Sequence, residues 1–313
     1  MLIDSRRCSE VDSDPVLMEG EIPGDWMDLV EAIHRKKGSA LILGGSDTGK
    51  STLAHLLVVQ LCQRGNVVAL VDGDIGQSVL GPPTTIGLAL FDSAVQKLKD
   101  GQVMASYFVG STSPRGHMLE MLVGIKRIAD RATQLEPEII IIDTTGFVIG
   151  EAAWELKFQK VDLLKPTHLI ALQRKREIEG LLRPHQFRPD MAIHCLKTPE
   201  KVRMKSPEQR RSNRSRKFAA YFREVKLYKK SLDGIKVVNP FRVRYRGKGL
   251  NGVLIGLNDE ANFNIGLGIL ENMDLHRGTI SFVAPELDSS SIRLIRIGSI
   301  EVDLFGDDRT HRP

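Results

Sequence analysis

The chain lacks the features of a membrane, secreted or metal-cluster protein. No apolar run approaches the ~18 residues of a membrane span. The N-terminal residues mix acidic and basic side chains, so no signal peptide is predicted. The three cysteines, Cys8, Cys62 and Cys195, lie far apart and show no metal-ligand spacing. We therefore expect a protein of a reducing compartment, the cytoplasm, with no membrane partner.

The positive charge of the chain is concentrated in one segment. The 313 residues carry a net charge of +5, but residues 197–230 contain 13 Lys or Arg against 3 Glu and so carry +10. The rest of the chain is acidic, at −5. A local basic patch attracts polyanions such as nucleic acid, although a charge run is more often a solvated helix face. Charge alone leaves both interpretations open.

Short apolar runs alternate with helical patterns over the first two thirds of the chain. Residues Trp26, Leu29, Val30 and Ile33 share one face of a predicted helix. Strands are predicted at 39–43, 67–71, 103–109, 138–142 and 167–172, and further helices at 51–63 and 118–135. This alternation is typical of an α/β fold with a mostly parallel sheet flanked by helices. Ligands of such sheets bind beyond the carboxyl ends of the strands.

The pattern changes near residue 233. Short β-like runs follow, separated by glycines and by Asn-Asp or Asp-Ser clusters, at 253–257, 263–269, 279–283, 292–297 and 300–304. We predict a lead-in over 1–23 and an α/β domain over 24–232. A small all-β domain is predicted over 233–313. The basic residues 197–230, called the lid segment below, end the α/β domain.

A complete Walker A motif lies between a predicted strand and a predicted helix. It consists of Gly44, Gly45, Ser46, Asp47, Thr48, Gly49, Lys50, Ser51 and the following Thr52. Its glycines turn backbone N–H groups toward phosphate oxygens, while Lys50 reaches the phosphates and Ser51 reaches Mg²⁺. The motif predicts a P-loop NTPase. ATP is favoured over GTP because the chain has no Asn-Lys-x-Asp segment, which reads guanine in GTPases.

Carboxylates follow two other predicted strands. Asp72 and Asp74 belong to the motif Asp-Gly-Asp-Ile-Gly-Gln, which follows the predicted strand at 67–71. One of these two carboxylates could face the reacting phosphate, and the other could face the protein interior. A carboxylate near the γ-phosphate holds Mg²⁺ or accepts a proton. Asp143 ends a run of four isoleucines, as in a Walker B motif. The spacing leaves open whether Asp74 or Asp143 dominates at Mg²⁺.

These segments together resemble the RNA polynucleotide 5′-hydroxyl kinase family. That family includes the kinase subunit of the pre-mRNA cleavage machinery, nucleolar rRNA-processing kinases, and archaeal and bacterial relatives. The resemblance runs from about residue 40 to about residue 305. Besides the motifs above it rests on Gly-Ser-Thr-Ser-Pro at 110–114, Asp-Thr-Thr-Gly-Phe-Val-Ile-Gly at 143–150, Lys-Pro-Thr-His at 165–168 and the basic helix at 206–222.

The resemblance implies a reaction and a role for each motif. The γ-phosphate of ATP is transferred to the 5′-hydroxyl end of RNA or DNA. Lys50 and Ser51 bind the ATP phosphates and Mg²⁺. Asp74 acts as the base toward the 5′-hydroxyl and helps to hold Mg²⁺, and Gln77 supports this site.

The resemblance also implies contacts with the nucleic acid. Thr112 or Ser113 contacts the phosphate or the RNA backbone. Phe147 occupies a position where relatives often carry a Trp that stacks on the terminal base, and a phenyl ring keeps a stacking face. Three lid arginines close over the transferred phosphoryl group: Arg210, Arg211 and Arg214.

Two other functions fit the same motifs. One is a regulatory or assembly ATPase, in which water is the attacking group. The other is a nucleic-acid-binding pseudokinase without 5′-kinase turnover. A basic segment and an aromatic side chain beside the phosphate loop favour a kinase over a switch ATPase, whereas a pseudokinase differs from a kinase only in its rate.

Overall fold

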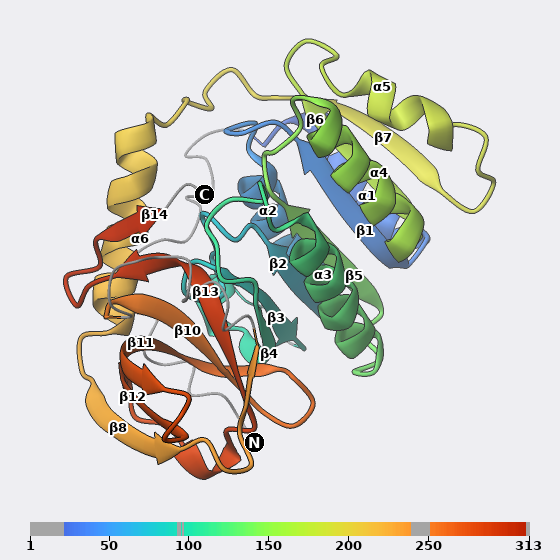
Figure 1. Cartoon of the computed structure of the whole chain (residues 1–313). Helices are drawn as coiled ribbons and strands as arrows, with labels where there is room; N and C mark the ends of the chain where they lie inside the picture. Colours follow the sequence, from blue (N-terminus) through green and yellow to red (C-terminus); the bar gives the residue numbers. More distant parts are fainter. Residues whose placement is uncertain (1–21, 93–94, 96, 239–250, 311–313) are drawn as a thin grey trace.

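The computed structural model describes residues 22–92, 95, 97–238 and 251–310. The predicted lead-in over 1–23 therefore lies almost entirely outside the described residues, as does Cys8. The described residues form two β-sheets together with helices (Figure 1). One is flanked by helices, and the other is formed by the C-terminal part of the chain. The predicted fold class, a P-loop α/β sheet followed by a small β domain, is confirmed.

The first sheet has seven strands in the order β4-β3-β2-β5-β1-β6-β7. Five of them, from β2 to β7 in that order, run parallel, while β3 is antiparallel to both of its neighbours. The strands are β1 (Gly38–Gly44), β2 (Val68–Gly73), β3 (Thr85–Phe91), β4 (Gln102–Phe108), β5 (Ile139–Thr144), β6 (His168–Gln173) and β7 (Ala192–Lys197).

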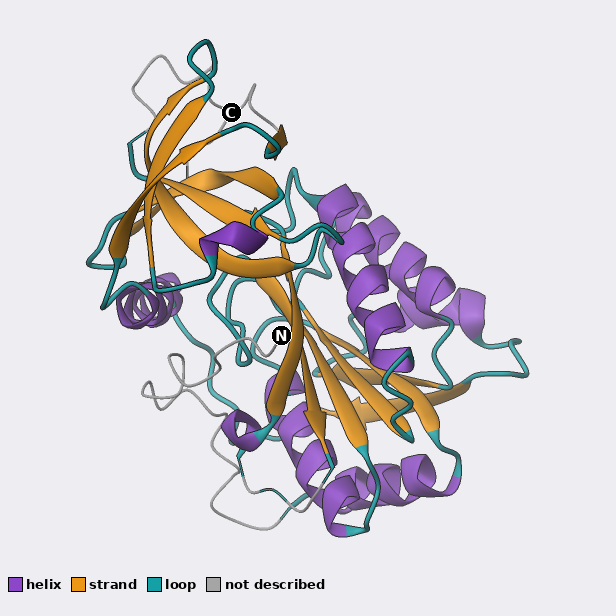
Figure 2. Ribbon diagram, turned by 90° about the horizontal axis from the view of Figure 1, so that it is seen from below, coloured by secondary structure: helices purple, strands orange, loops and turns teal. Residues whose placement is uncertain are grey.

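Helices cover both faces of this sheet (Figure 2). Along β1, Ala40 and Ile42 face one core, and Leu41 and Leu43 face the other, as the alternation of a strand requires. One core takes in α1 (Gly24–Arg35) and α2 (Lys50–Gln63). The other takes in α3 (Met118–Thr133), α4 (Glu151–Leu164) and α5 (Glu179–Leu182).

Sequence patterns missed α4, β3 and β7. The buried face of α4 includes two lysines, Lys157 and Lys160, so its apolar stripe is interrupted in the sequence. Lys157 is satisfied because its ammonium donates to Thr144 Oγ1 at 2.9 Å and to the Thr145 carbonyl at 2.6 Å. Burial lowers the pKa of Lys157 well below its usual value and that of Lys160 to about 8.

The second sheet has the strand order β14-β13-β10-β11-β12-β8, with β9 parallel to β13. The predicted runs at 292–297 and 300–304 form one strand, β13. Strand β8 belongs to this sheet although it precedes the expected boundary at 233. The strands are β8 (Lys226–Ser231), β9 (Lys236–Val238), β10 (Val253–Asn258), β11 (Asn264–Asp274), β12 (Thr279–Ala284), β13 (Leu294–Val302) and β14 (Asp308–Thr310). Within the described residues, short 3₁₀ turns occur at Leu98–Asp100, Arg183–His185 and Ser289–Ser291.

The lid segment contains helix α6 (Pro207–Tyr221), which lies beside the second sheet (Figure 1). The helix begins with a capping box: Ser206 Oγ accepts from Gln209 N at 3.2 Å, and Gln209 Oε1 accepts from Ser206 N at 2.8 Å. Phe218 and Phe222 pack into a core cluster with residues of the second sheet. The lid helix is therefore anchored on the β domain.

Candidate active site

The Walker A loop leaves β1 and enters α2 in the conformation expected of a phosphate-binding loop. Gly49 precedes the helix with φ +95°, in the left-handed region that glycine adopts freely. Lys50 is buried, and its ammonium donates to the Gly45 carbonyl at 2.7 Å. Burial lowers the pKa of Lys50, while the carboxylates of Asp143 and Asp74 act in the opposite direction. The loop thus holds its cation in place before any phosphate arrives.

Asp143 lies at the end of β5, next to the first turn of α2. Its Oδ2 accepts from the Ser51 hydroxyl at 2.6 Å, and its Oδ1 accepts from Thr144 N at 2.7 Å. Burial raises the pKa of Asp143 to about 6, against the attraction of Lys50. A serine hydroxyl and a carboxylate in contact are the hard oxygen donors that Mg²⁺ prefers.

Asp72 and Asp74 lie in different environments. Asp72 is buried, and its carboxylate accepts from Ser78 Oγ at 2.7 Å and from Val79 N at 2.6 Å, so it fixes the loop after β2. Burial raises its pKa, and these hydrogen bonds oppose the shift. Asp74 is half-buried, and one of its oxygens accepts from Gln77 N at 3.1 Å. It lines a cavity in front of the Walker loop.

A cavity of about 790 Å³ opens at the carboxyl edge of the first sheet, large enough for a nucleotide. Predicted site residues reach it from the Walker loop, from the loops after β2, β4 and β5, and from α6. They are Ser46, Asp47, Gly49, Lys50, Ser51, Thr52, Asp74, Gln77, Thr112, Ser113, Phe147, Arg210 and Arg214. Five other predicted residues do not line it: Gly44, Gly45, Thr48, Asp143 and Arg211.

The three lid arginines have different partners. Arg210 pairs with Asp47 of the Walker loop, and its carbonyl accepts from Gln77 Nε2 at 3.2 Å. Arg214 donates through Nε to Asp308 Oδ2 at 2.8 Å. Arg211 is more exposed, and its Nε lies 3.9 Å from Asp308 Oδ1. The structure therefore brings two of the three guanidiniums to the cavity and leaves Arg211 outside it.

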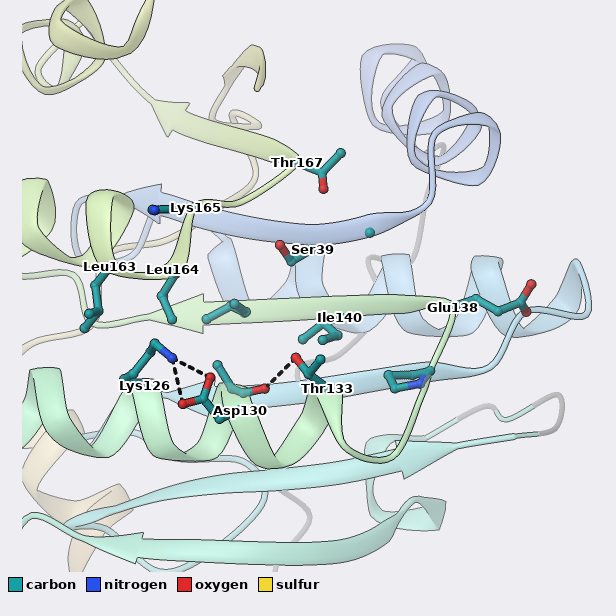
Figure 3. A pocket seen from close by; sticks show the side chains of 14 residues that line it. Ser39, Lys126, Asp130, Thr133, Glu138, Ile140, Leu163, Leu164, Lys165 and Thr167 are labelled. Atoms are coloured by element: carbon teal, nitrogen blue, oxygen red, sulfur yellow. Dashed lines mark hydrogen bonds and ion pairs between the residues drawn. The ribbon is translucent and has the colours of Figure 1, made fainter. Parts of the chain in front are cut away.

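A second cavity, of about 370 Å³, lies at the amino edge of the same sheet (Figure 3). Three of its polar side chains are already paired: the Lys126 ammonium binds both oxygens of Asp130, at 2.5 and 2.7 Å, and Thr133 Oγ1 donates to the Ala129 carbonyl. It is at the edge opposite to the Walker loop. We therefore assign no chemistry to it.

Comparison with known families identifies the phosphate-loop domain. The model of the family described as the P-loop of the mRNA cleavage and polyadenylation factor CLP1 matches residues 44–224. This chain belongs to the CLP1 P-loop family. It is therefore a nucleotide-binding protein of the kind that the Walker A motif predicts.

Some relatives of this CLP1-family chain are similar to it over nearly its whole length. A polyribonucleotide 5′-hydroxyl-kinase from Methanocaldococcus jannaschii is 32% identical, covering 92% of this chain and 94% of the relative. One of the same name from Pyrococcus abyssi is 30% identical, covering 95% and 97%. The polyribonucleotide 5′-hydroxyl-kinase Clp1 of Xenopus tropicalis is 27% identical, covering 58% of this chain and 43% of the relative.

A solved structure shares the fold of this CLP1-family chain. The complex of Clp1p with Pcf11p contains a chain that matches with a TM-score of 0.66 and 14% identity, over 88% of this chain and 79% of that one. The likeness confirms the architecture. Among the described residues, no helix is both long and apolar enough to cross a membrane, and no group of three or more His, Cys, Asp or Glu side chains is placed to hold a metal ion.

Several residues at the cavity were not predicted from the sequence. Arg115 also lines it, with its guanidinium carbon 5.7 Å from the centre of the Phe147 ring. Lys217 lines it as well and donates to the Ser78 carbonyl. The position of Lys217 could have been predicted from its spacing, because residues 210, 214 and 217 share one face of a helix. Asp308, the partner of Arg214, has no such signal, since it lies far along the chain in the β domain.

Proposed function

We propose that this protein is an ATP-dependent polynucleotide 5′-hydroxyl kinase, which transfers the γ-phosphate of ATP to the 5′-hydroxyl end of RNA or DNA. One observation carries the proposal: a phosphate loop, a half-buried carboxylate, two lid guanidiniums and an aromatic ring all line the same cavity. The names of the relatives with 30% identity or more support it. A switch ATPase needs the phosphate loop, but it does not need basic and aromatic side chains such as Arg210, Arg214 and Phe147 around the cavity.

The chain supplies each part of an in-line transfer. The backbone of the Walker loop and Lys50 bind the phosphates. Among the described residues, backbone N–H groups bind only Oδ1 of Asp74, and its other oxygen accepts the proton of the 5′-hydroxyl as it attacks. Arg210 and Arg214 stabilise the charge that spreads over the equatorial oxygens in the transition state.

The donor set fits one Mg²⁺ bound together with ATP. Mg²⁺ is usually held by one or two carboxylates plus substrate phosphates and water, and when bound it neutralises charge on the phosphates. Asp143 is the proposed ligand that orients Ser51, because the two side chains are in contact. Asp74 is then left to act on the hydroxyl.

The nucleic-acid end is proposed to bind between the loops after β4 and β5. Thr112 and Ser113 offer hydroxyls for the backbone of the first nucleotide. Phe147 offers a ring face to the terminal base, and Arg115 lies over the same ring. Stacking on the Phe147 ring or the Arg115 guanidinium binds any base without sequence preference, which suits a kinase that acts on many different nucleic-acid ends.

The direct test is incubation with γ-labelled ATP and 5′-hydroxyl oligonucleotides, RNA and DNA in parallel. We expect label in a 5′-phosphate end. Lys50→Ala should abolish the transfer while the fold survives, because it removes stabilisation of the developing charge. Lys126→Ala, on the opposite edge of the sheet, is the matched control and should keep full activity.

Two outcomes would overturn the proposal. Label found only as inorganic phosphate would make the protein a regulatory ATPase. Nucleotide and oligonucleotide binding without transfer, in protein whose melting temperature is normal, would make it a pseudokinase.

A further inference from the structure

The buried carboxylate of Asp308 is the partner of a lid arginine across the boundary between α6 and the β domain. The Asp308 side chain is 1% exposed, and its Oδ2 accepts from Arg214 Nε at 2.8 Å. Its second oxygen has no hydrogen-bond partner within the described part of the chain and lies 3.9 Å from Arg211 Nε. A buried carboxylate is costly unless it is paired, so this contact is strongly held.

The contact with Asp308 leaves the two terminal nitrogens of the Arg214 guanidinium available. Arg214 uses Nε for Asp308, and the described residues provide no hydrogen-bond acceptor for its two terminal nitrogens. Arg214 also lines the cavity in front of the Walker loop. A guanidinium fixed through Nε presents its terminal N–H groups in a defined direction, which matches the bidentate binding of phosphate oxygens.

The segment that carries Asp308 is itself held firmly against α6. Strand β14 pairs with β13, with Asp308 opposite Val302. In the turn between them Asp303 Oδ1 accepts from Phe305 N at 3.0 Å and from Asp307 N at 2.9 Å. Gly306 lies directly on the lid helix, because a Cβ there would overlap the Ser215 carbonyl. Asp308 is thus placed by a rigid turn and not by a loose tail.

The other two lid arginines lack this arrangement. Arg210 is held by Asp47, a residue of the Walker loop, so its contact must rearrange or be shared when phosphate binds. Arg211 has a 57% exposed side chain and does not line the cavity. Of the three, Arg214 alone both lines the cavity and is oriented from the β domain.

We propose that Asp308 is a positioning residue for phosphoryl transfer: it orients the Arg214 guanidinium toward the transferred group. The inference rests on the proposed kinase function. It gives the C-terminal β domain a direct part in the active site, since the residue that sets the lid cation belongs to β14. Asp308 acts through Arg214 and touches no substrate.

The test is single-turnover transfer at saturating ATP and oligonucleotide by Asp308→Asn, with Asp307→Asn as the matched control. Asp307 is the adjacent residue, has an exposed side chain and undergoes the same chemical change. We expect Asp308→Asn to slow transfer by about 10- to 100-fold, the range for loss of a partner that orients a functional side chain. The dissociation constant of ATP should change by no more than about twofold, because the arginine acts mainly in the transition state.

A double variant separates positioning from a general loss of structure. Asp308→Asn combined with Arg214→Ala should be no slower than Arg214→Ala alone, since the two residues act as one unit. Multiplied effects, or a rate for Asp308→Asn equal to that of Asp307→Asn, would overturn the inference. If Asp308→Asn does not fold, Arg214→Lys replaces it. Lysine keeps the charge but has no Nε fork, so slow transfer supports the inference and a wild-type rate refutes it.

The same assays keep the two proposals apart. Wild-type protein that transfers no label refutes the kinase function itself. Wild-type protein that is active, with Asp308→Asn equally active, refutes only the role of Asp308.

Discussion

At the scale of single residues, the two carboxylates of the Asp72–Gln77 motif have different surroundings. Asp72 accepts hydrogen bonds from Ser78 Oγ, Val79 N and Leu80 N, all within the loop that follows β2. Asp74 instead lines the cavity. The sequence motif contains both residues, but only their partners show which of them holds the loop.

We expect Asp74→Asn to reduce the transfer rate strongly with little change in melting temperature, because an amide cannot accept the proton of the attacking hydroxyl. Asp72→Asn should lower the free energy of unfolding by about 3 kcal/mol, since an amide nitrogen turns toward backbone donors. Single-turnover rates and urea unfolding of both variants check this. A crippled rate in Asp143→Asn with normal transfer by Asp74→Asn would reverse the assignment of base and metal ligand.

Asp143 gives the site a dependence on pH. Burial raises its pKa to about 6, so the carboxyl is ionised above that pH and takes up a proton below it. Metal ligation requires the ionised form. The folded pKa lies above the ordinary value, so we expect acidification through about pH 6 to weaken Mg²⁺-dependent ATP binding while it favours the folded state of the free protein.

The measurement is ATP affinity with Mg²⁺ relative to ATP affinity with a chelator, between pH 8 and pH 5, in the wild type and in Asp143→Asn. The ratio should fall more steeply with acidification in the wild type than in the variant, in which it should be low at every pH. The titration of ATP itself is common to both proteins and cancels. An equal pH dependence in the two proteins would show that Asp143 does not hold the metal.

At the scale of elements, five strands of the first sheet and the Walker loop followed from local signals, whereas β3 and β7 were missed. The continuous apolar run at 139–142 and the glycines of the phosphate loop are both visible within a few residues of sequence, so both were predictable. Helix α4 was not, because Lys157 and Lys160 occupy buried positions. The partners of the lid arginines were also beyond prediction, because helical spacing tells which side chains share a face but not what lies opposite that face.

The lid helix is tied to the Walker loop at its N-terminal end, through one carboxylate. Asp47 Oδ2 accepts from Lys205 N at 3.0 Å and pairs with Arg210. Asp47 has φ +54°, a conformation that aspartate and asparagine adopt more readily than other residues with side chains. Asp47→Asn should therefore keep the loop conformation but weaken the tie, since the ion pair is lost.

Hydrogen exchange of the free protein checks this. Amides from Lys205 to Arg210 should exchange faster in Asp47→Asn, while those of α3 are unchanged. ATP should protect this segment in the wild type, because the phosphates offer Arg210 a second anion. Unchanged exchange in the variant would mean that α6 is held by its packing on the β domain alone.

At the scale of the whole molecule, the two sheets share a core. Phe108, at the end of β4 in the first sheet, lies in one hydrophobic cluster with Phe218 of α6 and Leu254 of β10. The fit is close, since a Cβ at Gly256 would overlap the Phe108 ring. Ser299 of β13 also donates to the Gly110 carbonyl at 2.8 Å through its backbone, and its hydroxyl lies 2.9 Å from His117 Nε2. The β domain thus supports the loop with Thr112 and Ser113 as well as the lid.

This sharing predicts one cooperative unfolding transition for both sheets. Both tryptophans, Trp26 in α1 and Trp154 in α4, belong to the α/β domain, so tryptophan fluorescence reports this domain, whereas far-UV circular dichroism reports both domains. Their urea transitions should coincide, and Phe108→Ala should shift both together by about 3–5 kcal/mol, the cost of removing a buried phenyl ring. Phe91→Ala, in the core under α1 and α2, is the matched control for ring loss away from the shared core. If Phe108→Ala separates the two transitions while Phe91→Ala leaves them coincident, Phe108 is the residue that couples the sheets. Two transitions already in the wild type would mean that the domains fold independently and that contact through Phe108 is too weak to join them.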